Sequence, residues 1–315
     1  MPLSAVDLHR RLSFIKYLYR QALAQSRRPS PLEAAASILT FHDAVEAFLH
    51  LAVEHSGAQV KPRGPDFLEY WSLLAQAGCH LSPIGPLKRF NDVRVGLKHR
   101  GIFPSPEEIE SARVNVTTFF EDNTPRAFRP LAFAEVSLAE LVTLDIAKAA
   151  LIRADKLMTE HQLESALQQI ALAGYRLFRT YAKDPLGSHR FPSSHLHMDM
   201  HRLARSGRRG DPNNELQGEI NEVADGVNRV IEAVEAIERT LEILTLGIDF
   251  QRYRRFLELT PHITEDDPRK DEAVFHVNRR RTNPPTIDEV RYCYDFVIDA
   301  ALHLQVRAGH AGIGS

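Results

Sequence analysis

Hydrophobic residues recur every three or four positions along most of the chain, and polar residues fill the positions between them. This period puts the hydrophobic side chains on one face of an α-helix. The fold class that follows is all-α, built from antiparallel helical bundles. The pattern predicts helices over 4–25, 31–56, 66–77, 85–99, 105–122, 137–156, 159–183, 213–246 and 286–306.

Capping boxes support several of these helix starts. In a capping box a Ser or Thr hydroxyl accepts a hydrogen bond from a free backbone N–H, and a Glu or Gln three residues later bonds back. Each such pair predicts the start of a helix. The pairs are Ser30 and Glu33, Ser105 and Glu108, Ser137 and Glu140, Thr159 and Gln162, and Thr286 and Glu289.

Signs of β-structure are confined to one region. Aromatic residues alternate through Gly247–Pro261, and Ala273–Val277 is a second short segment that could pair with it. Alternation of this kind is typical of a strand. We therefore expect a small β-hairpin there.

The 213–246 helix has the most regular pattern, a hydrophobic seam with spacings that alternate between four and three. A seam of this kind packs against a second helix. The favoured partner is the 159–183 helix, in a long antiparallel hairpin; the alternative is an intermolecular coiled coil. The seam consists of Leu216, Ile220, Val223, Val227, Val230, Val234, Ile237, Leu241 and Leu244.

A Pro-containing segment, 123–132, separates the first five predicted helices from the rest. It predicts a helical domain over 1–124 and a second helical domain over 133–315 that contains the long hairpin. The segment 189–211 is rich in His and Arg. It is interpreted as a loop or as an arm that follows phosphates.

Composition limits the chemistry. The chain is 43% hydrophobic and 25% charged, which excludes wholesale disorder. Its two cysteines, Cys79 and Cys293, lack metal-ligand spacing, and no Walker loop, GxSxG or HExxH motif occurs. We expect no metal and no cofactor.

The N-terminal residues lack the cationic start and apolar core of a signal peptide. No apolar run approaches the length of about 18 residues that a spanning helix needs. We therefore expect a cytoplasmic protein without a membrane partner.

The formal net charge of −2 means that any nucleic-acid site must be a local patch. The 85–99 helix and its end supply one, because five cations there face a single acid, Asp92, for a local charge of five minus one, +4. Gly101 ends this helix, so His99 lies in its last turn. The cations are Lys88, Arg89, Arg94, Lys98 and Arg100.

An Arg followed by four residues and a His, at the end of a helix in an all-α domain, resembles the signature of HEPN domains. Here the pair is Arg94 and His99, with Asn91 and Asp92 upstream and Gly101 at the helix end. The resemblance covers about residues 1–122. It implies a metal-independent endoribonuclease that acts in stress response or antiphage defence as a toxin.

The resemblance implies that Arg94 and His99 are catalytic. A His with a near-neutral pKa can accept and donate the protons that are transferred during RNA cleavage. The planar guanidinium group of an Arg can stabilise the negative charge of the phosphorane. We expect supporting roles for Asn91, Asp92, Glu46 and His42, since in HEPN-like bundles the 31–56 helix packs beside the motif helix. Binding of RNA is assigned to Lys88, Arg89, Lys98 and Arg100.

Two alternatives remain open. The family often has a polar residue directly after the Arg, whereas this chain has Val95, which favours a non-catalytic RNA-binding or partner-binding subunit. On an ideal helix Arg94 and His99 point about 140° apart, so we expect a homodimer that shares one groove, with Gly96 allowing close approach. Alternatively, Arg269 and His276 supply the second half within one chain. A regulatory protein partner is also expected.

Overall fold

The computed structural model describes residues 3–59, 64–182, 215–265, 275–278 and 283–311. Helices dominate these residues, and a single two-stranded sheet accompanies them, so the all-α prediction is confirmed. The chain divides into two compact units, Met1–Thr143 and Leu144–Ser315.

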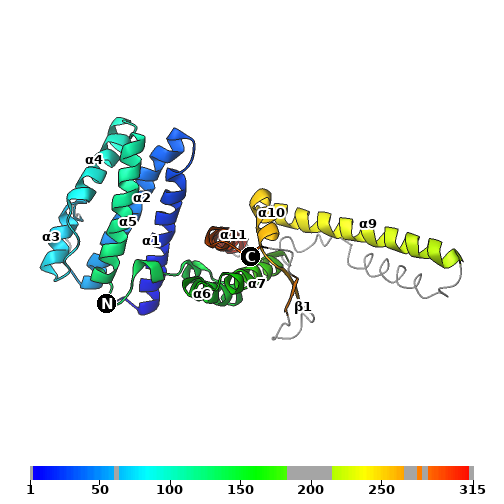
Figure 1. Cartoon of the computed structure of the whole chain (residues 1–315). Coiled ribbons are helices and arrows are strands. Elements are labelled where there is room, and N and C mark those ends of the chain that lie inside the picture. The colour runs from blue at the N-terminus through cyan, green and yellow to red at the C-terminus, as the bar shows by residue number, and fades with distance from the viewer. Residues whose placement is uncertain (1–2, 60–63, 183–214, 266–274, 279–282, 312–315) are drawn as a thin grey trace. The chain divides into compact units, whose positions relative to one another are not determined.

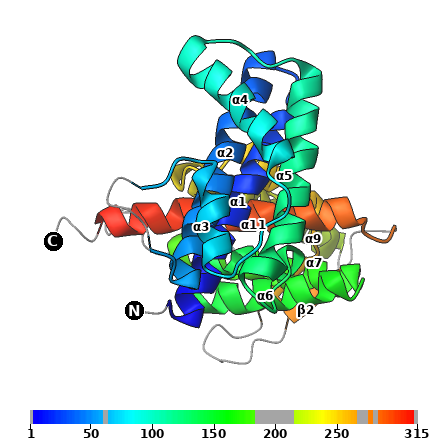
Figure 2. The same ribbon diagram turned by 90° about the vertical axis from the view of Figure 1, so that its left-hand side faces the viewer.

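Unit 1 is a helical bundle with α2 at its centre. Helix α2 lies between α1 on one side and α3 and α4 on the other (Figure 1), and the turned view shows α1, α2 and α5 together (Figure 2). The elements are α1 (Ala5–Ser26), α2 (Pro31–Ser56), α3 (Glu69–Gln76), α4 (Gly85–Arg100), α5 (Pro106–Ala127) and two 3-10 turns, η1 (Phe133–Glu135) and η2 (Leu138–Leu141).

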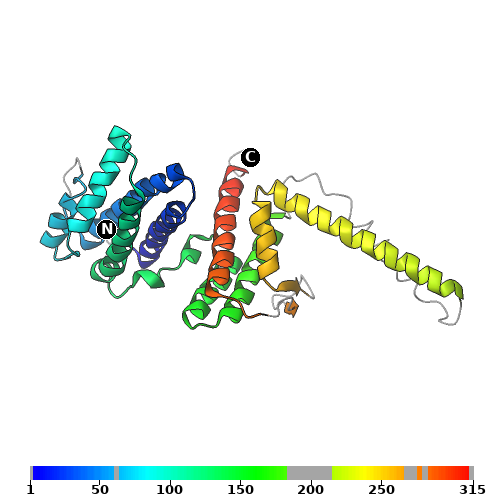
Figure 3. The ribbon, with the colours of Figure 1, turned by 45° about the horizontal axis from the view of Figure 1, so that its top comes forward.

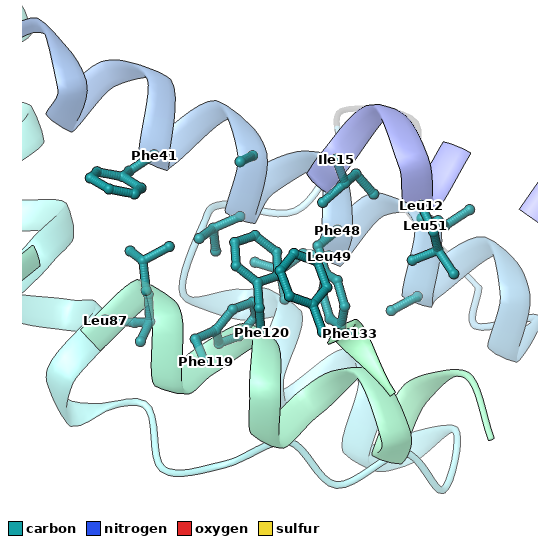
Figure 4. Packing of buried hydrophobic residues seen from close by; sticks show 14 of the residues in the cluster. Leu12, Ile15, Phe41, Phe48, Leu49, Leu51, Leu87, Phe119, Phe120 and Phe133 are labelled. Atoms are coloured by element: carbon teal, nitrogen blue, oxygen red, sulfur yellow. The ribbon is translucent and has the colours of Figure 1, made fainter. Parts of the chain in front are cut away.

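An aromatic cluster fills the core of unit 1 (Figure 4). The ring of Phe48 meets the rings of Phe119, Phe120 and Phe128 edge-on, at centroid distances of 5.2, 5.6 and 5.2 Å. This geometry suits the charge distribution of aromatic rings. By length and composition alone α2 is also a candidate membrane span, and 61% of that window is buried inside the unit.

The unit boundary differs from the predicted one. Residues 123–132 were expected to be a linker, but α5 continues to Ala127, halfway through that segment, and the chain after it packs onto unit 1. Phe133 stacks on Phe120 with centroids 4.6 Å apart, and Ser13 Oγ donates to the Ser137 carbonyl at 2.6 Å. These long-range contacts move the boundary to Thr143, and local sequence does not reveal them.

Only some of the predicted capping boxes form. The boxes at Ser105 and Thr286 are present, with both reciprocal hydrogen bonds. Ser30 begins α2 without a side-chain cap bond. Thr159 is wrong as a helix start, since it is the last residue of α6 and donates its hydroxyl to the Asp155 carbonyl.

This contrast gives a testable difference between two serines of unit 1. Ser105→Ala should lower the free energy of unfolding by about 1 kcal/mol, the usual cost of a lost N-cap. Ser30→Ala, which removes no cap bond, is the matched control and should change it by much less. Urea unfolding followed by the fluorescence of Trp71, the single tryptophan, measures both. Equal losses would contradict the assignment.

Unit 2 is built around α7, which packs against α6 and α11. Helix α10 approaches α7 closely at Gly174 of α7. A Cβ added there would lie only 2.8 Å from Cζ of Phe256 on α10. The elements are α6 (Asp145–Thr159), α7 (Leu163–Ala182), α9 (Glu215–Thr245), α10 (Phe250–Leu259), β1 (His262–Glu265), β2 (Phe275–Asn278) and α11 (Ile287–Ala311).

The predicted β-hairpin exists, but the sequence placed its first strand too early in the chain. Strands β1 and β2 pair antiparallel, with Ile263 opposite Val277. Most of 247–261 is instead helix α10, whose N-cap Asp249 accepts a hydrogen bond from the Arg252 backbone N–H at 2.9 Å. The aromatic spacing there therefore follows a helical period.

The long hairpin of α9 with α7 is not observed over the described residues. Helix α9 touches α7 and α10 only slightly (Figure 3). Most of its seam faces solvent, including Val223, Val230 and Ile237, which are 66%, 55% and 59% exposed. The prediction that α7 covers this seam is wrong.

Candidate functional site

The motif helix α4 ends as its sequence predicts. Gly101 has φ 65°, a left-handed conformation that glycine adopts without strain. The backbone N–H groups of Gly101 and Ile102 both bond to the Gly96 carbonyl. This stop leaves His99 in an exposed final turn.

The basic residues of α4 are uncompensated. Among the described residues none of them, nor His99, forms an ion pair or a side-chain hydrogen bond, and the nearby acid Asp92 is exposed without such a partner as well. Arg94 is half-buried, whereas the others are exposed. The others are Lys88, Arg89, Lys98 and Arg100. A surface of this kind attracts phosphate groups.

Arg94 and His99 are not brought into contact. Both lie on α4, and neither bonds to the other within unit 1. This agrees with the divergence of about 140° expected for residues five positions apart on a helix. One copy of this surface offers an Arg and a His to separate points of a substrate.

Two of the predicted supporting residues do meet. His42 of α2 is only 2% exposed, and its Nε2 lies 3.2 Å from Asn91 Oδ1 on α4. The imidazole also stacks on Phe67, with ring centroids 4.5 Å apart at 28°. His42 therefore fastens α2 to the motif helix three residues before Arg94.

Glu46 meets His42 rather than Arg94. Its Oε2 lies 3.7 Å from His42 Nδ1, and it forms no ion pair with Arg94. Burial, and then the positive charge of Arg94, lower the pKa of His42 to about 4, with a smaller lowering by Lys98 and an opposing effect of the Asn91 hydrogen bond. His42 is therefore neutral at pH 7, and its contact with Glu46 is not an ion pair.

Phe67 is a site residue that sequence reasoning missed. The pattern predicted a helix from residue 66, whereas Phe67 lies in the turn before α3, and no local signal places it on the His42 ring. Tyr70 follows in α3, where burial and then the charge of Glu46 raise its pKa to about 12. The Tyr70 hydroxyl itself bonds to His50, so the aromatic neighbours of His42 are Phe67 and Phe90.

Gly96 is not used by another helix of unit 1. A Cβ added there would meet only Ile102 Cβ, at 3.9 Å, among the described residues. Ile102 and Phe103, which follow the helix, are 58% and 61% exposed. Close approach at Gly96 therefore stays a prediction for a partner chain.

The alternative half-site and the basic insertion lie largely outside the described residues. Arg269 and the whole of 189–211 belong to segments that are not described, and His276 lies in β2.

Comparison with protein-family models, curated proteins and solved structures found no match to this chain.

Proposed function

We propose that this protein is a HEPN-like, metal-independent endoribonuclease of the cytoplasm that acts in stress response or antiphage defence. The observation that carries the proposal is the uncompensated positive surface of α4, with a half-buried Arg94 and an exposed His99 at its end. RNA is the substrate. A regulatory protein partner restrains the activity.

In the proposed reaction the 2′-hydroxyl attacks the adjacent phosphorus while its proton leaves to a base. The bond from O2′ to phosphorus forms, the bond from phosphorus to O5′ breaks, and O5′ takes a proton. The products are a 2′,3′-cyclic phosphate and a 5′-hydroxyl. His99 moves protons, since it is solvent-accessible, and Arg94 holds the phosphate oxygens with its planar fork.

Cleavage of RNA in the presence of EDTA tests this function. Wild type should cleave and leave cyclic phosphate ends, and His99→Ala should be slower by about 100-fold or more, the usual contribution of a general acid or base. His80→Ala, at another exposed histidine of unit 1, is the control and should keep full activity. Cleavage at equal rates by wild type and His99→Ala, or by neither protein, would contradict the catalytic assignment.

A non-catalytic RNA-binding subunit is the second candidate, favoured by Val95 directly after Arg94. It keeps the basic surface and lacks cleavage. Electrophoretic mobility shifts distinguish it: RNA binding that weakens in Lys98→Gln and Arg100→Gln, together with intact RNA in the same samples, would select this function.

We also propose a homodimer. One chain offers one Arg94 and one His99 that do not meet, and a two-fold axis would place two copies of each around one groove. Light scattering at micromolar concentration should give twice the chain mass of 35.6 kDa. A strict monomer that still cleaves RNA would contradict the shared groove.

A further inference from the structure

Three potential metal ligands share one turn of α2. His42, Asp43 and Glu46 each offer one ligand atom, and these atoms all lie within 4.8 Å of one another. Ligands of a tetrahedral zinc ion lie roughly 3–4 Å apart, given bonds of about 2.0–2.2 Å. Asp43 is exposed and Glu46 half-buried, so their side chains can rotate to close the remaining gap.

One of these ligand atoms is unsatisfied and buried. Nδ1 of His42 has no hydrogen-bond partner among the residues that the structure describes, and His42 is only 2% exposed. A buried polar atom without a partner destabilises the fold, because it has lost its hydrogen bonds to water. Nδ1 points toward Glu46 Oε2, 3.7 Å away, which is too long for a hydrogen bond.

The other ring nitrogen explains why Nδ1 lacks a proton to donate. Nε2 of His42 lies 3.2 Å from Asn91 Oδ1, and a carbonyl oxygen only accepts, so Nε2 donates there. In the neutral ring Nδ1 then carries a lone pair that faces the carboxylate of Glu46. Two electron-pair donors that face each other across this gap are stabilised by a cation between them.

The surroundings match those of a metal-bound histidine. Such a histidine usually donates its second ring N–H to a carbonyl or carboxylate, which fixes the tautomer and the ring. Asn91 accepts from Nε2, and Phe67 stacks on the ring at 4.5 Å. The ligand is therefore held in place before any ion arrives.

We propose that His42 Nδ1 and the carboxylates of Asp43 and Glu46 bind a divalent transition-metal ion. One nitrogen and two oxygens suit zinc or manganese better than magnesium or calcium, which prefer oxygen alone. Three protein ligands leave coordination positions free, and the exposure of Asp43 gives an ion access from solvent. This site is separate from the proposed cleavage chemistry, which needs no metal.

The charges around the site set its strength. The two carboxylates offset the charge of the ion, whereas Arg94 and Lys98 face His42 from α4 and oppose it. The affinity should therefore lie below that of a structural zinc site. A bound dication would in turn add positive charge beside the phosphate-binding face of α4.

The test uses the full chain after EDTA treatment and dialysis, titrated with ZnCl₂ and MnCl₂ by calorimetry. Wild type should bind about one more equivalent than Asp43→Asn or Glu46→Gln, or bind it at least tenfold more tightly. Asp122→Asn, at an exposed carboxylate of α5, is the matched control and should behave as wild type. Because the chain has 15 His, only the difference between variants counts.

Two results would overturn the site. One is identical binding by wild type, Asp43→Asn and Glu46→Gln, which would place the ions elsewhere. The other is a proton on His42 Nδ1 in ¹⁵N spectra of the metal-free protein at pH 7. In that case Nε2 would accept a hydrogen bond from the Asn91 amide group, and Nδ1 would have no lone pair for a metal ion. Neither readout involves RNA cleavage, so the site and the ribonuclease proposal can fail independently.

Discussion

Arg94→Gln is expected to lower the rate of RNA cleavage by about 100- to 1000-fold, the usual loss when one oxyanion-stabilising donor is removed. Arg94 has no ion-pair partner in the described part of the chain, so its guanidinium is available to a phosphate. Arg94→Lys keeps the charge but loses the planar fork, and should give an intermediate rate. Single-turnover cleavage in EDTA measures all three proteins.

A second measurement separates this role from a structural one. Since the charge of Arg94 lowers the pKa of His42, that pKa should rise in Arg94→Gln and stay low in Arg94→Lys. An NMR titration of the His42 ring follows it. If Arg94→Gln cleaves RNA at a rate within threefold of the wild-type rate, Arg94 has no catalytic role.

Acid should destabilise unit 1 through His42. Burial first, and Arg94 second, lower the pKa of His42 from 6.5 to about 4 in the folded protein. Below pH 6.5 the unfolded chain therefore binds a proton that the folded chain rejects. The free energy of unfolding should fall by up to about 3 kcal/mol between pH 6.5 and pH 4, and none of this loss should occur above pH 7.

Urea unfolding at a series of pH values, with EDTA present and Trp71 fluorescence as the signal, measures this loss. His42→Gln is the matched variant, because an amide can still bond to Asn91 but does not titrate in this range. Its unfolding energy should depend less on pH than that of wild type. Parallel curves for the two proteins would show that His42 is not the responsible group.

The sequence predicted helices best where their ends carry local signals. Gly101 stops α4 where expected, and Ser105 starts α5 with its capping box. Helix α10 was missed because its residues, with Phe256 and Leu259 on the buried side, also fit an alternating pattern in so short a segment. Periodicity over ten residues does not separate the two structures, whereas the Asp249 cap would have favoured a helix.

The candidate site was predictable only in part. The spacing of Arg94 and His99 placed both on one helix, and this needed only local information. The pairing of His42 with Asn91 joins residues 49 positions apart, and Phe67, predicted within a helix over 66–77, stacks on His42 from a turn. Contacts of this range depend on how helices pack, which a single sequence does not encode locally.

The late position of Phe133 has a consequence for the order in which the chain becomes stable during its synthesis. Tyr19 meets both Phe120 and Phe133, at centroid distances of 5.3 and 5.4 Å. Until the ribosome has released the segment that contains Phe133, the growing bundle has all five of its described α-helices, but Tyr19 and Phe120 lack their contact with Phe133. A nascent chain paused shortly after α5 would expose an aromatic surface of the kind that chaperones bind.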